Sequence, residues 1–392
     1  MGCSFFQKKE VNIRAKDFKR RTRIRKERLG EAAPTGTKRP GRETRKATPT
    51  RTKTSLFQRR RRPPMQAAAM APPDEDAVEA AAPASSLIFL GTGCSGALPD
   101  VRCLIRPSTP PCATCSQAHT LPPEQNPNYR CNTSLLIDYC DNDGTHKYII
   151  IDVGKTFREQ VLRWFVHHKV PSINSIILTH EHADAVLGLD DVWLVHPSNH
   201  KNEIDQVPVF LTQFTMESVG ARFPYLVEQK VEEGDEMARV AQLDWTIIEC
   251  DVDKPFVSSG LEFVPLPVMH GEDYVCLGFL FGRKARVAYL SDVSRILPRT
   301  EHTISKYGAG QLDLLILETN RLHGVGHARS SHLTFTETLH TIKRICPKRA
   351  LLIGMNHEFE HHRENHVLEE WSGREGIPVQ LAHDGLRICI DL

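Results

Sequence analysis

The sequence contains no apolar run long enough to cross a membrane. A spanning helix needs about 20 mostly apolar residues, and no window of the 392 residues approaches that length without charges. Cysteine is also sparse, because eleven in so long a chain are too few for a disulfide scaffold, and no secretory signal precedes them. We therefore expect reduced thiols or metal ligands, and no transmembrane segment.

The small net charge hides two regions of opposite sign. The whole chain carries +2, yet residues 1–62 hold 22 basic and 5 acidic side chains, whereas residues 63–392 hold 28 basic and 43 acidic ones. Residues 1–62 lack apolar periodicity and residues 63–85 are rich in Pro and Ala. These compositions predict a disordered basic extension followed by a linker. The folded domain is predicted to span residues 86–392.

The basic extension admits several partners. Its first residues, Met1-Gly2-Cys3-Ser4, fit a lipidated N-terminus that binds anionic lipid, although Phe6 stands where this signal prefers Ser or Thr. Its five acidic residues are more than an organelle transit peptide normally carries. Residues 59–62 are all Arg, which is typical of a nuclear localisation signal or of a phosphate-binding patch. Contact with a membrane surface or with nucleic acid stays open, as do organelle import, nuclear targeting and the oligomeric state. The default expectation is a cytoplasmic location.

The pattern from residue 86 onward predicts an α+β fold. Short apolar runs between turn signals indicate many strands, and apolar residues at helical spacing indicate a few helices. This mixture suggests two packed sheets with helices outside. Strands are predicted at 87–90, 134–137, 148–151, 175–178, 209–211, 245–249, 261–265, 276–281, 287–290, 314–317, 350–353 and 386–390. Helices are predicted from 157 to before Pro171, and at 186–195, 215–226, 334–345 and 366–371.

Residues that bind metals follow directly after one of these strands. The segment 179–184 reads Thr-His-Glu-His-Ala-Asp and comes after the apolar residues 176–178. Because side chains alternate along a strand, His180 and His182 point the same way and both imidazoles can bind one cation. Asp184, at the next alternate position, adds a carboxylate oxygen.

Two later strand ends offer further ligands. His270 follows the run 264–269, and Asp292 follows residues 288–291. Polar residues that come after a buried strand are typical of active sites built on loops over a rigid sheet. Three histidines with carboxylates favour zinc or another borderline divalent metal.

In order and spacing, these residues resemble the metallo-β-lactamase hydrolase superfamily over roughly residues 87–392. Within it the likeness is greatest to the phosphodiesterase branch that includes the phosphoribosyl cyclic phosphodiesterase (PhnP-like). The resemblance implies a four-layer αββα sandwich and metal-dependent hydrolysis, with Zn²⁺ or Mn²⁺ at the catalytic site. The segments that carry it are 90–95, 151–158, 318–320, 331–335 and 347–350.

The sequence departs from the family pattern at both histidines of the second metal site. The family's third histidine falls on Ala185, and its last one falls on Gly354. One site stays complete with His180, His182, His270 and Asp292, whereas the other keeps only Asp184 and the shared Asp292. A single catalytic metal is therefore the simpler expectation, unless His357 or His361 substitutes.

A second cluster of ligands is expected in a Pro-rich loop. Cys112 and Cys115 are spaced as in zinc knuckles, a spacing that redox pairs share, and Cys103 lies nine residues earlier. The resemblance adds His357, because the branch holds a structural zinc with a cysteine cluster and a late histidine. Cys103 is our inferred third thiolate ligand, with Cys131 as its competitor.

The resemblance also suggests a mechanism. A metal-bound hydroxide would attack a phosphodiester, with Asp184 or Asp292 orienting the water. His332 would act as general acid, because the matching family position donates a proton. Arg321, His323 and His327 are candidates to bind substrate phosphate.

We thus predict a phosphodiesterase acting on a small or cyclic phosphodiester. A thioester or ester hydrolase of the same fold, and a non-catalytic binding module stabilised by metal, are the alternatives. Cleavage of tRNA is disfavoured, because the chain lacks the long arm of the tRNA-processing members and its folded part is acidic.

Overall fold

The computed structural model describes residues 85–197, 205–227, 240–324 and 330–392. The chain divides into two compact units, Met1–Asp76 and Ala77–Leu392, and every described residue belongs to the second. The predicted extension and linker, residues 1–62 and 63–85, lie outside the described residues apart from Ser85. No helix of the described residues is long and apolar enough to span a membrane.

The first sheet has seven strands, antiparallel at one edge and parallel at the other. Strands β15, β1, β2 and β3 pair antiparallel, and β3, β4, β5 and β6 pair parallel. In sheet order the bounds are β15 (Arg387–Cys389), β1 (Ser86–Gly91), β2 (Ser134–Cys140), β3 (His146–Ile151), β4 (Ser175–Ile177), β5 (Val207–Leu211) and β6 (Leu243–Ile247).

The second sheet repeats this arrangement with eight strands. Strands β11, β8, β9 and β10 pair antiparallel, β10, β12, β13 and β14 pair parallel, and β7 pairs with β8. The bounds are β7 (Phe256–Ser258), β8 (Leu261–Met269), β9 (Val275–Phe281), β10 (Val287–Leu290), β11 (Arg295–Ile296), β12 (Leu314–Glu318), β13 (Ala350–Ile353) and β14 (Val379–Leu381).

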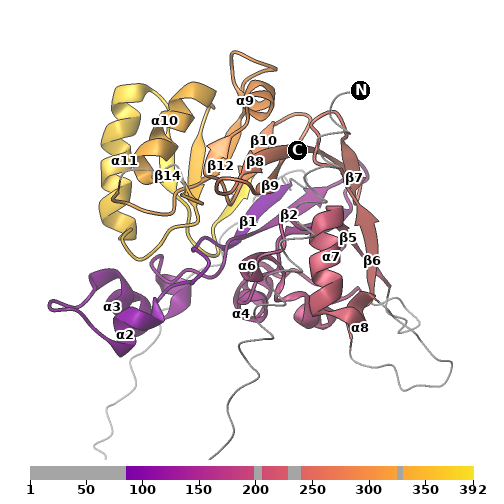
Figure 1. Cartoon of the computed structure of the whole chain (residues 1–392), viewed down its shortest axis with the longest axis horizontal. Helices are drawn as coiled ribbons and strands as arrows, with labels where there is room; N and C mark the ends of the chain where they lie inside the picture. The colour runs from indigo at the N-terminus through magenta and orange to yellow at the C-terminus, as the bar shows by residue number, and fades with distance from the viewer. Residues whose placement is uncertain (1–84, 198–204, 228–239, 325–329) are drawn as a thin grey trace, which may run out of the picture. The chain divides into compact units, whose positions relative to one another are not determined.

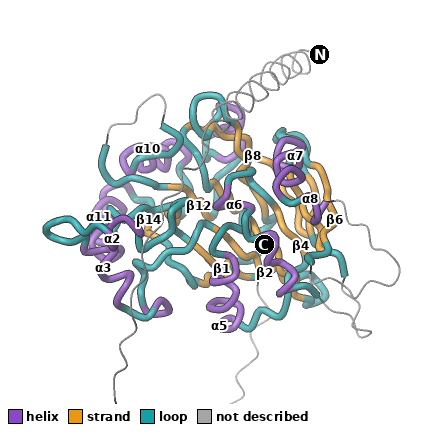
Figure 2. Tube along the Cα trace, turned by 60° about the horizontal axis from the view of Figure 1, so that its bottom comes forward, coloured by secondary structure: helices purple, strands orange, loops and turns teal. Residues whose placement is uncertain are grey.

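Helices cover the outer faces of both sheets (Figures 1 and 2). The best-defined helix is α10, which begins with a reciprocal capping box between Thr334 and Glu337 and buries Phe335, Ile342 and Ile345. The helical segments are α2 (Val101–Ile105), α3 (Ala113–Thr120), η1 (Pro123–Gln125), α4 (Phe157–Gln160), η2 (Val161–Phe165), α5 (Val166–His168), α6 (Ala183–Val186), η3 (Leu189–Val195), α7 (Gln213–Arg222), α8 (Pro224–Val227), α9 (Pro298–Ile304), α10 (Phe335–Ile345) and α11 (His361–Glu375).

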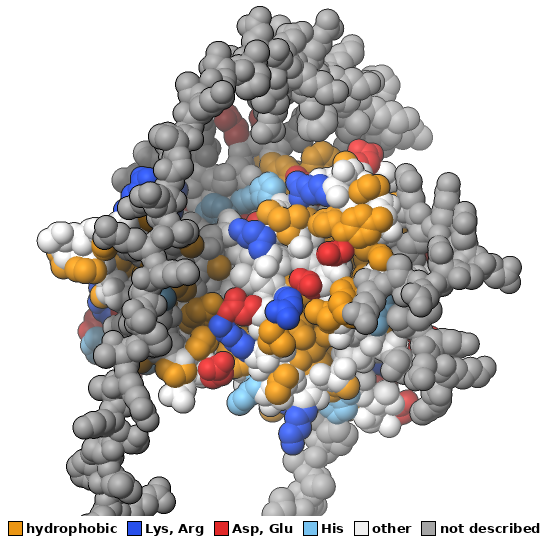
Figure 3. All heavy atoms as spheres, turned by 90° about the horizontal axis from the view of Figure 1, so that it is seen from below, with side chains coloured by type: hydrophobic (Ala, Val, Ile, Leu, Met, Phe, Trp, Pro, Cys, Tyr) orange, Lys and Arg blue, Asp and Glu red, His pale blue; other side chains and the backbone are white. Residues whose placement is uncertain are grey.

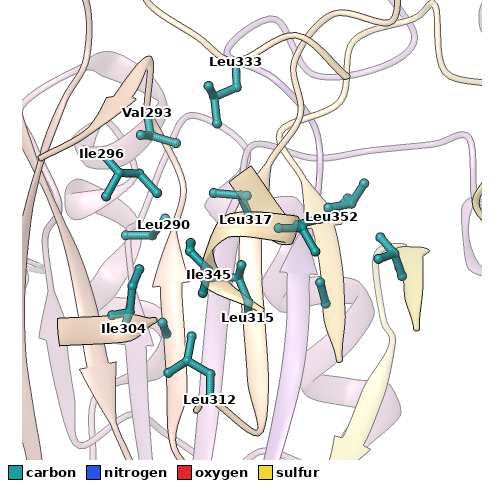
Figure 4. Close-up of a cluster of buried hydrophobic side chains, with 14 of the residues drawn as sticks. Leu290, Val293, Ile296, Ile304, Leu312, Leu315, Leu317, Leu333, Ile345 and Leu352 are labelled. Atoms are coloured by element: carbon teal, nitrogen blue, oxygen red, sulfur yellow. The ribbon is translucent and has the colours of Figure 1, made fainter. Parts of the chain in front are cut away.

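Three apolar cores separate the four layers. On β1, Ile88 and Leu90 pack toward the helices, while Leu87 and Phe89 pack between the two sheets, as the two-residue period of a strand requires. The third core lies between the second sheet and helices α9 to α11; Figure 4 shows part of it around Leu315 and Leu317. This αββα sandwich confirms the predicted α+β fold class.

Several elements differ from the predictions. The predicted helix 186–195 is wrong as one α-helix: α6 ends at Val186 and a 3-10 helix, η3, follows. Gly188 separates the two, and a Cβ on it would lie 2.5 Å from the Gly154 carbonyl oxygen, so the chain packs too closely there for any side chain. The short strands β7, β11 and β14 and the helices α2, α3 and α9 were not predicted, because two to eight residues carry too little periodicity.

The parallel strands place their carboxyl ends at one edge of the sandwich. Active sites of α/β sheets lie beyond such strand ends. The residues that follow or end these strands are Asp152 after β3, His180 after β4, Asp292 after β10, Glu318 in β12 and Gly354 after β13.

One buried carboxylate ties the C-terminal segment to the first strand. Asp384 accepts hydrogen bonds from the Thr92 amide and hydroxyl, both at 2.8 Å, and from the Cys131 amide at 2.6 Å. Burial raises the pKa of Asp384 to about 7. These bonds link loops that are far apart in sequence beside the predicted zinc loop.

We predict that Asp384→Ala lowers the free energy of unfolding by about 3 kcal/mol, because three buried donors lose their acceptor. Urea denaturation measures this change. The matched control is Asp391→Ala, which removes an exposed carboxylate paired with Lys284 and should change stability by less than about 0.5 kcal/mol. Equal effects of the two substitutions would contradict the prediction.

Candidate metal centre

Three histidines converge at the carboxyl ends of β4 and β8. The donor nitrogens of His180, His182 and His270 all lie within 4.8 Å of one another. His180 is buried, and His182 occupies the N-cap of α6. The nitrogens His270 Nε2 and His182 Nδ1 lie 3.3 Å apart. Nitrogens that approach a common point in this way can bind one cation.

Hydrogen bonds determine which nitrogen of each imidazole is free. The Thr179 hydroxyl donates to Asp152 Oδ2 at 2.8 Å, so its oxygen must accept from His180 Nδ1, also at 2.8 Å. His180 Nε2 then carries a lone pair, and this buried atom has no hydrogen-bond partner. Likewise His270 Nδ1 donates to the Ser331 carbonyl oxygen at 2.7 Å, which leaves its Nε2 unprotonated. Two imidazoles thus present bare Nε2 atoms, the state in which histidine binds a metal.

Burial further favours the neutral form of the first ligand. Desolvation, together with the charge of His182, lowers the pKa of His180 well below its ordinary value. A buried nitrogen without a partner is costly in a folded protein, unless a cation occupies the place. The donor set therefore fits a divalent metal.

An acidic pair extends the site on its other side. Asp292 Oδ1 lies 3.9 Å from both His270 Nε2 and His332 Nδ1. Glu318 contacts His332 Nδ1 through Oε1 and accepts the Val293 amide through Oε2 at 2.8 Å. Glu318 is buried, so its carboxylate holds both the ring of His332 and the loop that carries Asp292.

The surroundings raise the pKa of both Glu318 and His332. Burial raises the pKa of Glu318 to about 7. Burial alone would lower the pKa of His332, but the charges of Glu318 and Asp292 raise it to about 9. The protonated form of His332 is therefore favoured beside the candidate metal ligands.

Asp184 stands apart from both ligand groups. It lies in the first turn of α6, is half-buried, and belongs to none of the three groups of donor atoms within 4.8 Å of one another, which are His180 with His182 and His270, His270 with Asp292 and His332, and the cysteine cluster with His357. The loop after β3 supports this turn, because Gly154 lies so close that a Cβ there would meet the Asp184 carbonyl oxygen at 1.8 Å. Asp184 nevertheless contributes its charge to the environment of His332.

The two positions that lack the family's histidines carry no ligand. Ala185 is buried in the core beneath the helices. Gly354 has a φ of +76°, and a Cβ on it would lie 2.9 Å from Glu318 Cγ. His361 belongs to none of the groups of described residues whose donor atoms lie within 4.8 Å of one another, and its Nε2 lies 3.0 Å from Asn365 Nδ2.

The predicted cysteine cluster also assembles. The donor atoms of Cys103, Cys112, Cys115 and His357 all lie within 4.8 Å of one another. His357 Nδ1 is 3.3 Å from Cys103 Sγ and 3.5 Å from Cys112 Sγ. Cys131 is buried elsewhere and donates its amide to Asp384, so the structure brings Cys103 to the cluster in its place. Three thiols and one imidazole are a donor set typical of structural zinc.

Sequence reasoning missed the roles of Asp152, Thr179 and Glu318. Asp152 and Glu318 stand at the ends of apolar strands, as Asp292 does, and this position was the available signal. Of the predicted phosphate-binding residues, Arg321 lines a pocket with His332, His323 is exposed, and His327 lies outside the described residues.

Comparison with known proteins agrees with this geometry. Residues 147–355 match the model of the beta-lactamase superfamily domain, which is more than half of the chain. The chain belongs to the beta-lactamase superfamily. A crystal structure of a new diphosphatase from the PhnP family is 26% identical, covers 79% of this chain and 98% of its own, and superimposes with a TM-score of 0.60. The predicted PhnP-like branch is thereby confirmed.

Two further relatives extend the comparison. Zn²⁺-bound PqqB from Methylobacterium extorquens shares the fold, with 16% identity, 78% of this chain and all of its own chain covered, and a TM-score of 0.56. An octanoyltransferase of Porphyromonas gingivalis (strain ATCC BAA-308 / W83) is 27% identical over 309 residues, or 77% of this chain. The chain spans about half (52%) of the length of that curated relative. The superfamily consists mostly of metal-dependent hydrolases that bind divalent metals.

We predict that the purified protein binds about two zinc equivalents, one at each cluster, rather than three, because Ala185 and Gly354 supply no ligands. Elemental analysis after dialysis measures this stoichiometry. His270→Ala should remove one equivalent, whereas His340→Ala, on the exposed face of α10, should remove none. Three firmly bound equivalents would show that another residue repairs the second site.

Proposed function

We propose that this protein is a metal-dependent phosphodiesterase that acts on a small or cyclic phosphodiester. The observation that carries the proposal is the convergence of the three histidines and Asp292 with the half-buried His332 and its buried partner Glu318. A site with metal ligands on one side and a proton donor on the other supplies what phosphodiester hydrolysis needs. The similar PhnP-family diphosphatase supports phosphoryl chemistry.

His180, His182, His270 and Asp292 would hold the metal, and Asp184, which lies outside these ligand groups, adds its charge to the environment of His180. A divalent cation bound there supplies charge neutralisation at a phosphoryl oxygen and lowers the pKa of water. Asp292 or Asp184 would accept a hydrogen bond from the attacking water and so orient it. Zn²⁺ suits the imidazole ligands, and Mn²⁺ suits the carboxylates.

His332 donates the proton that the leaving alkoxide needs. Glu318 holds Nδ1, so Nε2 is the nitrogen left for the substrate, and the ring lines the adjacent pocket. The carboxylates around it keep the imidazole protonated at neutral pH, because they raise its pKa to about 9. A general acid in this state is ready to protonate a leaving oxygen.

The pocket beside His332 has the size of a small substrate. Its volume is about 250 Å³, just below the range of about 300 to 1,000 Å³ that is typical of ligand sites. It is lined by Cys94, Ser95, Gly96, Ala97, Leu98, Asp100, Arg102, Asn320, Arg321, His332, Asn356 and His357. The face in Figure 3 intersperses acidic, basic and apolar side chains, and its described part shows no continuous basic surface of the kind that nucleic-acid enzymes present.

A substrate panel tests the reaction class. The metal-loaded protein should hydrolyse bis(p-nitrophenyl) phosphate and cyclic nucleotides, and His270→Ala should abolish both activities. Acylglutathione thioesters belong in the panel, because the octanoyltransferase relative acts on acyl groups. Turnover of thioesters alone would reject a phosphodiesterase. If none of these substrates is hydrolysed, a non-catalytic binding module is favoured.

We predict that His332→Ala lowers kcat about 10²- to 10⁴-fold for a diester with an alkoxide leaving group. The loss should be about tenfold or less for p-nitrophenolate, which leaves without a proton. Steady-state kinetics with the two leaving groups measures the difference. The control is His340→Ala, which changes an exposed histidine of α10. An equal loss for both leaving groups would show that His332 is no proton donor.

A further inference from the structure

The pocket beside His332 shares one residue, His357, with the cysteine cluster. Its lining includes the cluster ligand His357, together with Asp100 and Arg102 from the start of α2. Asp100 belongs to both places, because its backbone amide donates to Cys115 Sγ at 3.4 Å while its residue faces the pocket. The cluster is therefore part of the pocket wall as well as a crosslink of the loop.

A four-residue segment after β13 connects the two metal centres. It begins at Gly354, against Glu318, and ends at His357, in the cluster. Between them Asn356 lines the pocket, and its amide donates to the Asn320 carbonyl oxygen at 3.2 Å. Asn356 directly precedes His357, and its side-chain oxygen accepts the Glu358 amide at 2.9 Å, so this pocket residue and the cluster ligand lie on the same short turn.

The cluster ligands themselves come from short and poorly buried elements. Helix α2 buries none of its residues, and the three thiols are supplied by α2, by the N-cap of α3 and by α3 itself. Elements with so few buried contacts have little packing to hold them in place. A zinc ion bound by the four donors would supply that rigidity directly.

We infer that zinc binding at Cys103, Cys112, Cys115 and His357 builds one wall of the substrate pocket and thereby sets substrate affinity. This inference rests on the proposed function, in which His332 delivers its proton to the leaving group. The leaving group then lies on the His332 side, in the pocket that Asn320, Asn356, Ser95 and the cluster enclose. The cluster thus acts on KM, while the histidine centre acts on kcat.

The test compares Cys112→Ser with the exposed-cysteine control Cys389→Ser in the full-length protein. Cys112→Ser should release one zinc equivalent, lower the melting temperature and raise KM about tenfold, with kcat changed less than about twofold. Cys389→Ser should change none of these. Loss of zinc with an unchanged KM would overturn the inference, and so would an equal fall in kcat.

A second measurement does not depend on activity or on the folding of that variant. In protein labelled with ¹⁵N-asparagine, removal of the cluster zinc by a thiol-directed mercurial should shift the side-chain amide signal of Asn356, which Asn356→Ala identifies. The amide signal of Asn142, on the exposed turn between β2 and β3, serves as the control and should stay in place. Asn356→Ala should also raise KM while the protein keeps two zinc equivalents. If the Asn356 signal does not shift after zinc loss, the inference that the cluster builds the pocket wall is rejected. If the protein hydrolyses no phosphodiester, only the proposed reaction is rejected.

Discussion

The hydrogen-bond chain from Asp152 through Thr179 to His180 is the constraint on which the site depends. Asp152 accepts both the amide and the hydroxyl of Thr179, so the threonine oxygen can only accept from the imidazole. That direction fixes the tautomer of His180 and leaves its Nε2 bare in a buried place. A buried nitrogen with a free lone pair and no hydrogen-bond partner is suited to bind a metal ion.

The two-sheet architecture explains why so many acidic groups meet here. Parallel strands of both sheets end at the same edge, and three of them deliver Asp152, Asp292 and Glu318. Like charges that approach one another in a buried site repel, so cations are needed among them. His332 supplies one positive charge through its contact with Glu318, and a metal on the histidines would supply the rest. The same acidic groups therefore favour a protonated His332 and a cation at the histidines.

The sequence predicted the parts of the site that follow local rules. His180 and His182 were found from the two-residue period of a strand, and His270 and Asp292 from their positions after strands. The contact between Glu318 and His332 was not, because a turn and a loop separate them and only the tertiary fold brings Nδ1 to the carboxylate. Spacing also left Cys103 and Cys131 as alternatives, since both lie near the Cys112 pair in sequence. The tertiary fold separates them, because Cys103 and not Cys131 has its sulfur within 4.8 Å of the donor atoms of Cys112, Cys115 and His357.

The segment after β13 shows how one metal site can lose its ligands without disturbing the other. Gly354 keeps the left-handed backbone of the turn, and its carbonyl oxygen accepts from Asn320 Nδ2 at 3.0 Å. The path of the chain to His357 is therefore fixed by the backbone and by Asn320, and it does not require a side chain at position 354. A histidine there would have to displace Glu318, which holds His332 and the loop of Asp292. The same carboxylate that positions the proton donor thus fills the space beside Gly354, which fits a site with a single catalytic metal.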